Sequence, residues 1–371
     1  MNNTYISFLK YCLDISSPIP DDADSIDWND MLVWAEKQSI VGIVFGGIQR
    51  ADKSLNIPYE LLLKWIGNAT FIENRNTLLN KRCVEVRDYF TTKGFDSCIL
   101  KGQGNALAYP NALSRTPGDI DVWVMPGERL KVNGSRFNAK EVIRFVKGIN
   151  PKGRAEYHHI DFGEFNGVEV ETHYRPTFMN NLIANRRLQR WMVEHADEQF
   201  KNQITLPNQE GLISVPTWEF NVVFQLSHIY RHIIQEGIGL RQIIDYYYLL
   251  RSNTNSTNVT NLQDTLRYLG LETIAGAMMW VLNEELGLHE DYLIASKDEK
   301  RGRVLLEEIM KGGNFGSYDQ KNKKSSSRLK KNIQRVKRDI GMVRYFPSEC
   351  LWEPVFRVFH YFWRLKYNEI I

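Results

Sequence analysis

Two segments decide the fold of this chain: Leu100-Lys101-Gly102-Gln103-Gly104 and, further along, Asp119-Ile120-Asp121-Val122-Trp123-Val124. The first continues a short strand candidate, Ser97–Leu100, and leads into a short helix candidate, Asn105–Tyr109. Gly102 and Gly104 would let the main chain approach a ligand closely, and the start of the helix would direct its N–H groups at an anion. The first segment therefore predicts a phosphate-binding turn.

The second segment predicts a strand with carboxylates at its start. Asp119 and Asp121 are two residues apart, so on a strand both side chains project from the same face. Convergent carboxylates suit Mg²⁺ ions, which prefer oxygen ligands and share their coordination shell with substrate phosphates. A later strand candidate alternates in the same way and places Glu169, Glu171 and His173 on one face. If the two strands are neighbours, one glutamate completes a site of three carboxylates.

A mixed α/β unit occupies the middle of the chain, and helical patterns flank it. Asn166-Gly167 between the strand candidates Glu156–Phe162 and Val168–Tyr174 is a strong hairpin signal. Apolar residues recur at helical spacing over residues 28–45, 57–90, 139–147, 216–237, 240–250, 262–287, 297–311 and 327–366. We therefore expect an α+β protein with an N-terminal helical region (1–95), a mixed central domain (96–204) and a C-terminal helical domain (205–371).

The composition is that of an ordinary globular protein. Of the 371 residues, 43% are apolar and 25% are charged. These proportions exclude a mostly disordered chain. The four cysteines are scattered and form neither a zinc pattern nor a disulfide framework. The N-terminus lacks the features of a secretory leader, and no apolar run has the length of a membrane span. We therefore expect a cytoplasmic protein without a membrane partner; its oligomeric state stays open.

Positive charge is unevenly distributed along the chain. The net charge is +3, yet nine Lys or Arg and no acidic residue lie between Lys321 and Arg338. Such a run could follow a nucleic-acid backbone, but it contains no aromatic residue on which bases would stack. We interpret it as a solvated face, and the near-neutral total also disfavours a nucleic-acid partner.

Several short motifs together carry a family resemblance. In chain order they are Leu100-Lys101-Gly102, Tyr109-Pro110, Arg115, Asp119-Ile120-Asp121 and Glu171-Thr172-His173. The combination resembles the bacterial "uncharacterised nucleotidyltransferase" family of the DNA polymerase β-like nucleotidyltransferase superfamily. The run from Arg115 to Asp121 is also similar to aminoglycoside and lincosamide nucleotidyltransferases. The resemblance implies a polymerase β-like palm between helical regions, with Mg²⁺ or Mn²⁺ as the cofactor and a nucleoside triphosphate as co-substrate.

The resemblance also implies roles for individual residues. The expected metal-binding and catalytic residues are Asp119, Asp121 and Glu171, and Glu171 is preferred over Glu169 because the Glu-x-His step matches the family pattern. The expected nucleotide-binding residues are Lys101, Gly102, Gln103, Gly104 and Arg115. The turn departs from the family's usual Gly-Ser or Gly-Gly, so the backbone and Lys101 would have to bind the phosphates without a serine hydroxyl.

Further residues could line an acceptor pocket. His228 and His232 share a helix face, which could reflect helix packing, a substrate pocket or, with weaker support, zinc binding. Arg241 and Asp245 form either an ordinary i,i+4 ion pair or part of the pocket. His173 could support a ligand or pack in the core.

Three functions fit these features. The favoured one is an enzyme that transfers a nucleoside monophosphate from a nucleoside triphosphate to a hydroxyl group of a small molecule. The alternatives are transfer to a protein or RNA, and a non-catalytic nucleotide-binding protein with the same fold. Because all three carboxylate positions are filled, the sequence disfavours the non-catalytic alternative.

Overall fold

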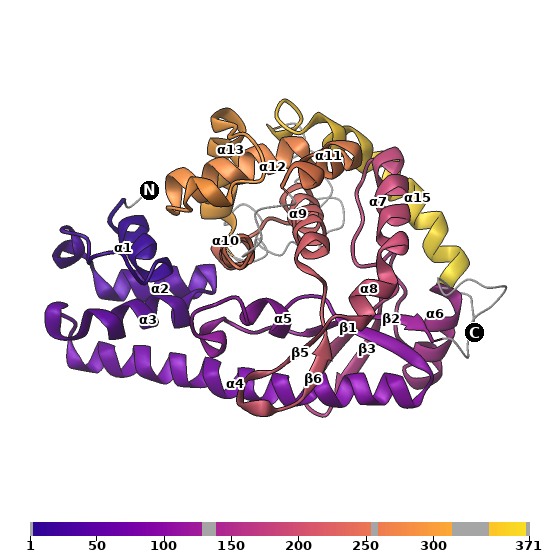
Figure 1. Ribbon diagram of the computed structural model, residues 1–371, viewed down its shortest axis with the longest axis horizontal. Helices are drawn as coiled ribbons and strands as arrows, with labels where there is room; N and C mark the ends of the chain where they lie inside the picture. Colours follow the sequence, from indigo (N-terminus) through magenta and orange to yellow (C-terminus); the bar gives the residue numbers. More distant parts are fainter. Residues whose placement is uncertain (1–2, 128–138, 254–258, 314–340, 369–371) are drawn as a thin grey trace, which may run out of the picture.

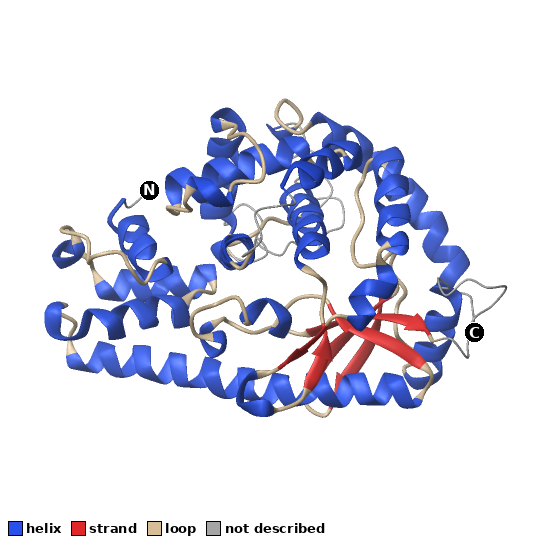
Figure 2. Ribbon diagram, in the orientation of Figure 1, coloured by secondary structure: helices blue, strands red, loops and turns tan. Residues whose placement is uncertain are grey.

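A mixed sheet of four strands lies toward the lower right of the view, with helices above and below it (Figure 2). The computed structural model describes residues 3–127, 139–253, 259–313 and 341–368. The strands of this sheet are β1 (Phe95–Ile99), β2 (Ile120–Pro126), β3 (His159–Phe165) and β4 (Val168–His173). Their order is β1-β2-β4-β3, with β2 and β4 parallel and the other two pairs antiparallel. The predicted α+β class with a polymerase β-like palm is confirmed.

The hairpin between β3 and β4 forms at the predicted turn. The backbone φ angles are 49° at Asn166 and 83° at Gly167. Two successive positive φ angles are what the central residues of a type I′ turn require. β3 begins later than the predicted strand Glu156–Phe162. The Glu156 N–H donates to the carbonyl of His159 at 2.9 Å, so the chain turns just before the strand.

The two faces of the sheet contact different helices. In β2, Ile120, Val122 and Val124 face the apolar cluster formed with α4 (Tyr59–Thr92) and α6 (Ala139–Ile149). Figure 1 shows α4 running along this side of the sheet. On the opposite face, Trp123 stacks at 5.6 Å between ring centroids on Phe220 of α9 (Trp218–Gln235). The face that carries Asp121 is therefore the one that meets the C-terminal helices.

The N-terminal helices lie beside the start of α4. They are α1 (Asn3–Leu13), α2 (Trp28–Gln38) and α3 (Val41–Ala51). The helical pattern predicted over residues 28–45 is therefore divided between α2 and α3. Ser39 follows α2 with a left-handed backbone, at a φ of 56°. A left-handed residue at this position ends a helix and lets α3 leave in a new direction.

The remaining α-helices are a short one within the palm and those that follow the palm along the chain. They are α5 (Gln103–Ala106) within the palm and then α7 (Leu182–Glu194), α8 (Ala196–Lys201), α10 (Leu240–Arg251), α11 (Val259–Leu269), α12 (Glu272–Trp280), α13 (Glu299–Gly312) and α15 (Pro347–Asn368). The helix expected over 262–287 is interrupted at Gly270, where φ is 77°. The basic run from Lys321 to Arg338, and with it part of the helix expected over 327–366, lies outside the described residues.

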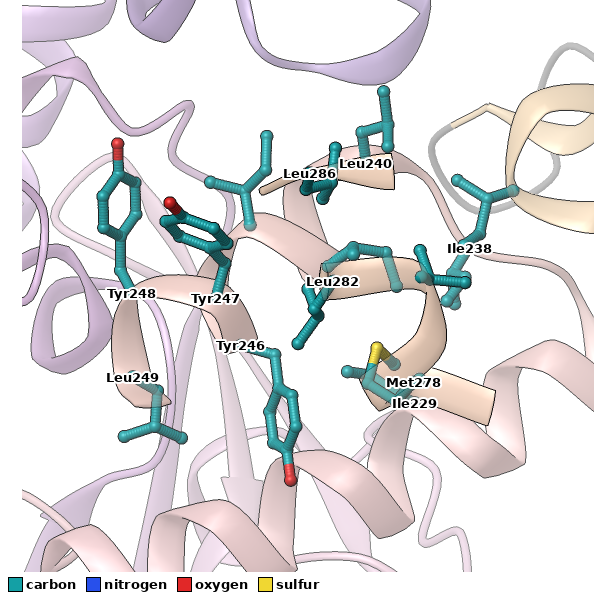
Figure 3. Packing of buried hydrophobic residues seen from close by; sticks show 14 of the residues in the cluster. Ile229, Ile238, Leu240, Tyr246, Tyr247, Tyr248, Leu249, Met278, Leu282 and Leu286 are labelled. Atoms are coloured by element: carbon teal, nitrogen blue, oxygen red, sulfur yellow. The ribbon is translucent and has the colours of Figure 1, made fainter. Parts of the chain in front are cut away.

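Apolar packing fixes α10 against its neighbours. Figure 3 shows Tyr246 and Tyr247 of α10 beside Leu282, in a buried cluster that also contains Leu249 and Met278. α10 is buried along almost its whole length, including its polar residues. Side chains at its N-terminal end are therefore held rigidly where they meet the palm.

A second hairpin was not predicted from the sequence. The strands β5 (Gln203–Thr205) and β6 (Leu212–Ser214) pair antiparallel and are too short to show a clear alternation. In the described part of the chain, no helix combines the length and apolar character that crossing a membrane requires.

Candidate active site

Three carboxylates converge at the edge where β2 and β4 begin to pair. In the parallel register Asp121 lies opposite Glu171, and Asp119 directly precedes β2. Oxygen atoms of Asp119, Asp121 and Glu171 all lie within 4.8 Å of one another. Glu169 pairs with Glu164 on β3 and is not one of these three carboxylates. The sheet register therefore brings Glu171, and not Glu169, to the aspartates.

Asp121 is the buried member of this group. Its Oδ1 lies 3.0 Å from the Lys101 Nζ and 2.9 Å from the His173 Nε2. Burial opposes the negative charge, but the Lys101 ammonium and the His173 imidazole together hold the pKa of Asp121 well below its usual range. Asp121 is therefore an ionised carboxylate inside the protein.

The negative charge of Asp121 makes Asp119 harder to ionise. The pKa of Asp119 is raised to about 6, first by the negative charge of Asp121 and then by burial. Carboxylates this close repel one another unless a cation lies between them. The three carboxylates, held within 4.8 Å, offer oxygen atoms only. Oxygen is the ligand that a hard divalent cation prefers. Asp119, Asp121 and Glu171 thus have the ligand atoms and the spacing to bind a hard divalent cation.

The glycine turn before α5 differs in part from the expectation. Gly102 has a φ of 57°, which glycine adopts without strain. A Cβ on Gly104 would lie 2.9 Å from a methyl group of Val215, so Gly104 is required for packing. The Gln103 side chain is buried and donates to the Asn80 side chain of α4, away from the carboxylates. The following helix begins at Gln103, earlier than the predicted Asn105–Tyr109, and has a single turn.

A pocket with basic side chains opens on one side of Asp119. Its polar lining residues are Lys101, Asn105, Arg115, Asp119, Asp121, Gln225, His228, Arg241, Gln242 and Asp245. Residues from the turn, from α9 and from α10 therefore face one another across it. Of the four expected acceptor residues on α9 and α10, His228, Arg241 and Asp245 line this pocket and His232 does not.

Arg115 lines this pocket and forms a buried ion pair with Asp245. Its Nε and Nη2 donate to the two Asp245 oxygens at 2.7 and 2.8 Å, and Tyr109 OH donates to Asp245 at 2.6 Å. All three side chains are buried. Arg241 donates to the carbonyl of Thr116 at 3.2 Å. Asp245 thus joins α10 to the segment before β2, a role that the predicted i,i+4 pairing with Arg241 does not describe.

A pocket with acidic side chains lies on the other side of Asp119. Its lining comprises Arg75, Gly118, Asp119, Asp161, Glu169, Val170 and Glu171. Gly118 and Asp119 belong to both pockets. The carboxylates therefore lie at the boundary between an acidic pocket and a pocket of mixed charge, which we call the basic pocket because it contains Lys101, Arg115 and Arg241.

Sequence reasoning missed a cluster of histidines around Arg231. The Arg231 guanidinium is buried and donates to His158, His228 and His232 at 3.1, 3.4 and 2.7 Å. His232 in turn lies 3.2 Å from Glu236. The local signals of this cluster in the sequence are the adjacent pair His158-His159 and the i,i+4 pair His228 and His232, and neither pair alone distinguishes a packing role from a polar cluster.

This geometry agrees with the comparison to known families. A model described as "Uncharacterised nucleotidyltransferase" matches residues 24–287. The chain belongs to this family. The family is one of nucleotidyltransferases, which are transferases, and its match spans most of the N-terminal helices, the palm, and the helices through α12. No curated protein and no solved structure matches the chain.

Proposed function

We propose that this family member transfers a nucleoside monophosphate from a nucleoside triphosphate to a hydroxyl group of a small molecule. The observation that carries the proposal is the convergence of Asp119, Asp121 and Glu171 between a pocket that contains three cations and a pocket whose charged lining is mostly acidic. Phosphates are attracted to the basic pocket. The acceptor then approaches from the acidic side.

The basic pocket supplies the groups for the triphosphate. Lys101 lies at the boundary with the carboxylates, 3.0 Å from Asp121, and has the reach to contact a phosphate oxygen. Main-chain N–H groups around Gly102 take the place of the missing serine hydroxyl. The Arg115 guanidinium donates two of its N–H groups to Asp245 and has fewer left for phosphate. Arg241 and His228 line the same pocket and supply further donors.

The carboxylates hold the metal, which we propose to be Mg²⁺ or Mn²⁺. When bound, a divalent cation stabilises charge on the attacking and leaving oxygens of an in-line displacement. The acceptor oxygen forms a bond to the α-phosphorus, the bond from that phosphorus to the bridging oxygen breaks, and pyrophosphate leaves with the electron pair. Glu171 lines the acidic pocket and orients the acceptor hydroxyl, whose proton leaves to a base.

The test is incubation of the protein with each labelled nucleoside triphosphate, Mg²⁺ or Mn²⁺ and a metabolite extract. We expect pyrophosphate release that depends on the extract and on the metal, and a labelled small product. The Asp121→Asn variant is the matched control. Label found only in protein or RNA would favour the macromolecular alternative, and nucleotide binding without pyrophosphate release from any extract would favour the non-catalytic one.

A further inference from the structure

A second group of potential metal ligands adjoins the three carboxylates. His159 and His173 lie directly opposite each other on β3 and β4, and Glu171 precedes His173 by two residues on the same face. The His173 Nε2 lies 3.5 Å from the Glu171 Oε2, and the His159 Nδ1 lies 3.8 Å from the same oxygen. All three residues offer ligand atoms within 4.8 Å of one another.

These separations suit a metal bound to nitrogen and oxygen. A tetrahedral ion with bonds of about 2.0–2.1 Å has ligand atoms roughly 3.3 Å apart. The two measured separations to Glu171 exceed that value by only a few tenths of an ångström. The three residues lie on paired strands, whose register holds their backbones in place.

The carbonyl group of Arg175 orients the His173 ring so that its Nε2 faces the site. The His173 Nδ1 lies 3.4 Å from the carbonyl oxygen of Arg175, which can only accept a hydrogen bond. The His173 Nε2 lies 2.9 Å from the Asp121 Oδ1 and 3.5 Å from the Glu171 Oε2, so without a metal it donates to a carboxylate, and a bound metal would take the place of that proton. Histidines that bind metals typically donate their other ring N–H to a carbonyl or a carboxylate in this way.

Polar neighbours also orient the His159 ring. The Arg231 guanidinium can only donate, and it occupies the His158 Nε2 at 3.1 Å. The His159 Nδ1 lies 3.1 Å from that nitrogen and 3.8 Å from the Glu171 Oε2, so it faces both His158 and the site. The other nitrogen, Nε2, lies 3.6 Å from the Asp161 carboxylate. His159 thus stands between a carboxylate and the site.

We propose that His159, Glu171 and His173 bind a divalent transition-metal ion beside the oxygen-only site of Asp119, Asp121 and Glu171. Imidazole ligands favour ions such as Zn²⁺, with Co²⁺ as its spectroscopic substitute, over Mg²⁺, whereas carboxylates alone suit Mg²⁺ or Mn²⁺. The two neighbouring positions would then select different metals and share one carboxylate. This inference goes beyond the proposed transferase activity and does not depend on it.

The test is titration of the metal-stripped full chain with Co²⁺, followed by calorimetry and by visible absorption, with no nucleotide present. We expect one equivalent of Co²⁺ to bind with the absorption of a nitrogen-containing, four- or five-coordinate site, and more tightly than Mg²⁺. His159→Ala should weaken Co²⁺ binding by about a hundredfold, and Asp161→Asn by about tenfold because it only orients His159. His195→Ala, which changes an exposed histidine on another element, is the control.

Two further variants separate this site from the carboxylate site. Asp119→Asn should leave Co²⁺ binding intact, whereas Glu171→Gln should weaken it. His173→Gln, checked for folding by circular dichroism, is the second test of the buried histidine. The proposal is overturned if the wild type binds Co²⁺ no more tightly than Mg²⁺, or if folded His159→Ala binds Co²⁺ as the wild type does. Because no nucleotide is present, a failure of the proposed transferase function would not alter this result.

Discussion

The two pockets that meet at Asp119 differ in charge and in origin. The basic pocket is built where the turn after β1 faces α9 and α10, and its three cations, Lys101, Arg115 and Arg241, are accompanied by Asp119, Asp121 and Asp245. The acidic pocket is built from the sheet edge and α4, and it contains Asp161, Glu169 and Glu171 with Arg75 as its cation. One pocket therefore depends on the packing of distant helices, and the other depends mainly on strand register.

Under the proposed function, this difference would let one site hold two unlike substrates. A triphosphate is strongly anionic, so it gains from ammonium and guanidinium groups in a partly buried pocket. The acidic pocket repels the same phosphates and leaves its space to the acceptor. Substitutions on either side of Asp119 should therefore affect different kinetic constants, which the following predictions test.

The largest effect is expected at the boundary itself. Asp121→Asn removes the charge that Lys101 and His173 contact, and transfer should fall by roughly 10²–10⁴-fold because metal stabilisation of the displacement is lost. The rate of pyrophosphate release measures this. Asp264→Asn, on the exposed surface of α11, is the matched control. A rate near that of the wild type in Asp121→Asn would exclude this carboxylate as a metal ligand.

The next effect distinguishes two glutamates on one strand. Glu171→Gln should lower kcat by about a hundredfold, because its carboxylate belongs to the convergent group. Glu169→Gln should change kcat by no more than about threefold, since it only lines the acidic pocket. Both variants remove one negative charge by the same Glu→Gln substitution, so each serves as the control for the other. The opposite ranking would assign the third metal ligand to Glu169.

A smaller effect should separate the two pockets by substrate. Lys101→Met should raise the KM for the nucleoside triphosphate by about tenfold to a hundredfold, as expected for the loss of a charged contact. Arg75→Met, which removes the cation of the acidic pocket, should leave that KM nearly unchanged. Initial rates over a nucleotide series measure both variants. Equal increases in KM would show that the triphosphate does not distinguish the pockets.

The smallest effect is on stability in the absence of metal. The pKa of Asp119 is raised to about 6 in the folded chain, above its ordinary value of 3.8, so its ionisation disfavours the fold. This destabilisation is absent below about pH 4 and grows as the pH rises through about 6. Asp119→Asn should therefore melt slightly higher than the wild type at about pH 7.5, with a difference of a few degrees at most, because the Asp119 side chain keeps contact with solvent that screens its charge.

The same melting experiment tests metal binding. Mg²⁺ or Mn²⁺ with a nucleoside triphosphate should raise the melting temperature of the wild type, because ligands that bind only the folded state stabilise it. Asp119→Asn should respond less. Equal shifts in both proteins would contradict the assignment of Asp119 to the metal site.

Local sequence patterns were enough to predict much of the palm. Asn166-Gly167 specified its hairpin because few residues adopt two successive positive φ angles. The alternation of Glu171 with His173 specified which side chains share a face, since this depends on the strand alone. The Asp-x-Asp spacing did the same for the other strand. These features are encoded within a few neighbouring residues.

Other features could not be predicted because they depend on helix packing. The breaks at Ser39 and Gly270 lie within patterns that continue at helical spacing, and only the packing shows that the chain changes direction there. The Gln103 side chain could equally face a ligand or the core. Its contact with Asn80 exists because α4 passes close to the turn.

The sequence by itself determined the type of chemistry, and the tertiary structure decided how the charges are arranged around it. Asp119, Asp121 and Glu171 could be identified from their spacing and from the family resemblance. The pairing of Arg115 with Asp245 and the ring of histidines around Arg231 could not. A buried charge needs a partner in space, and the partner of Arg115 is on α10, far along the chain. Only the packing of α9 and α10 against the palm brings such groups together.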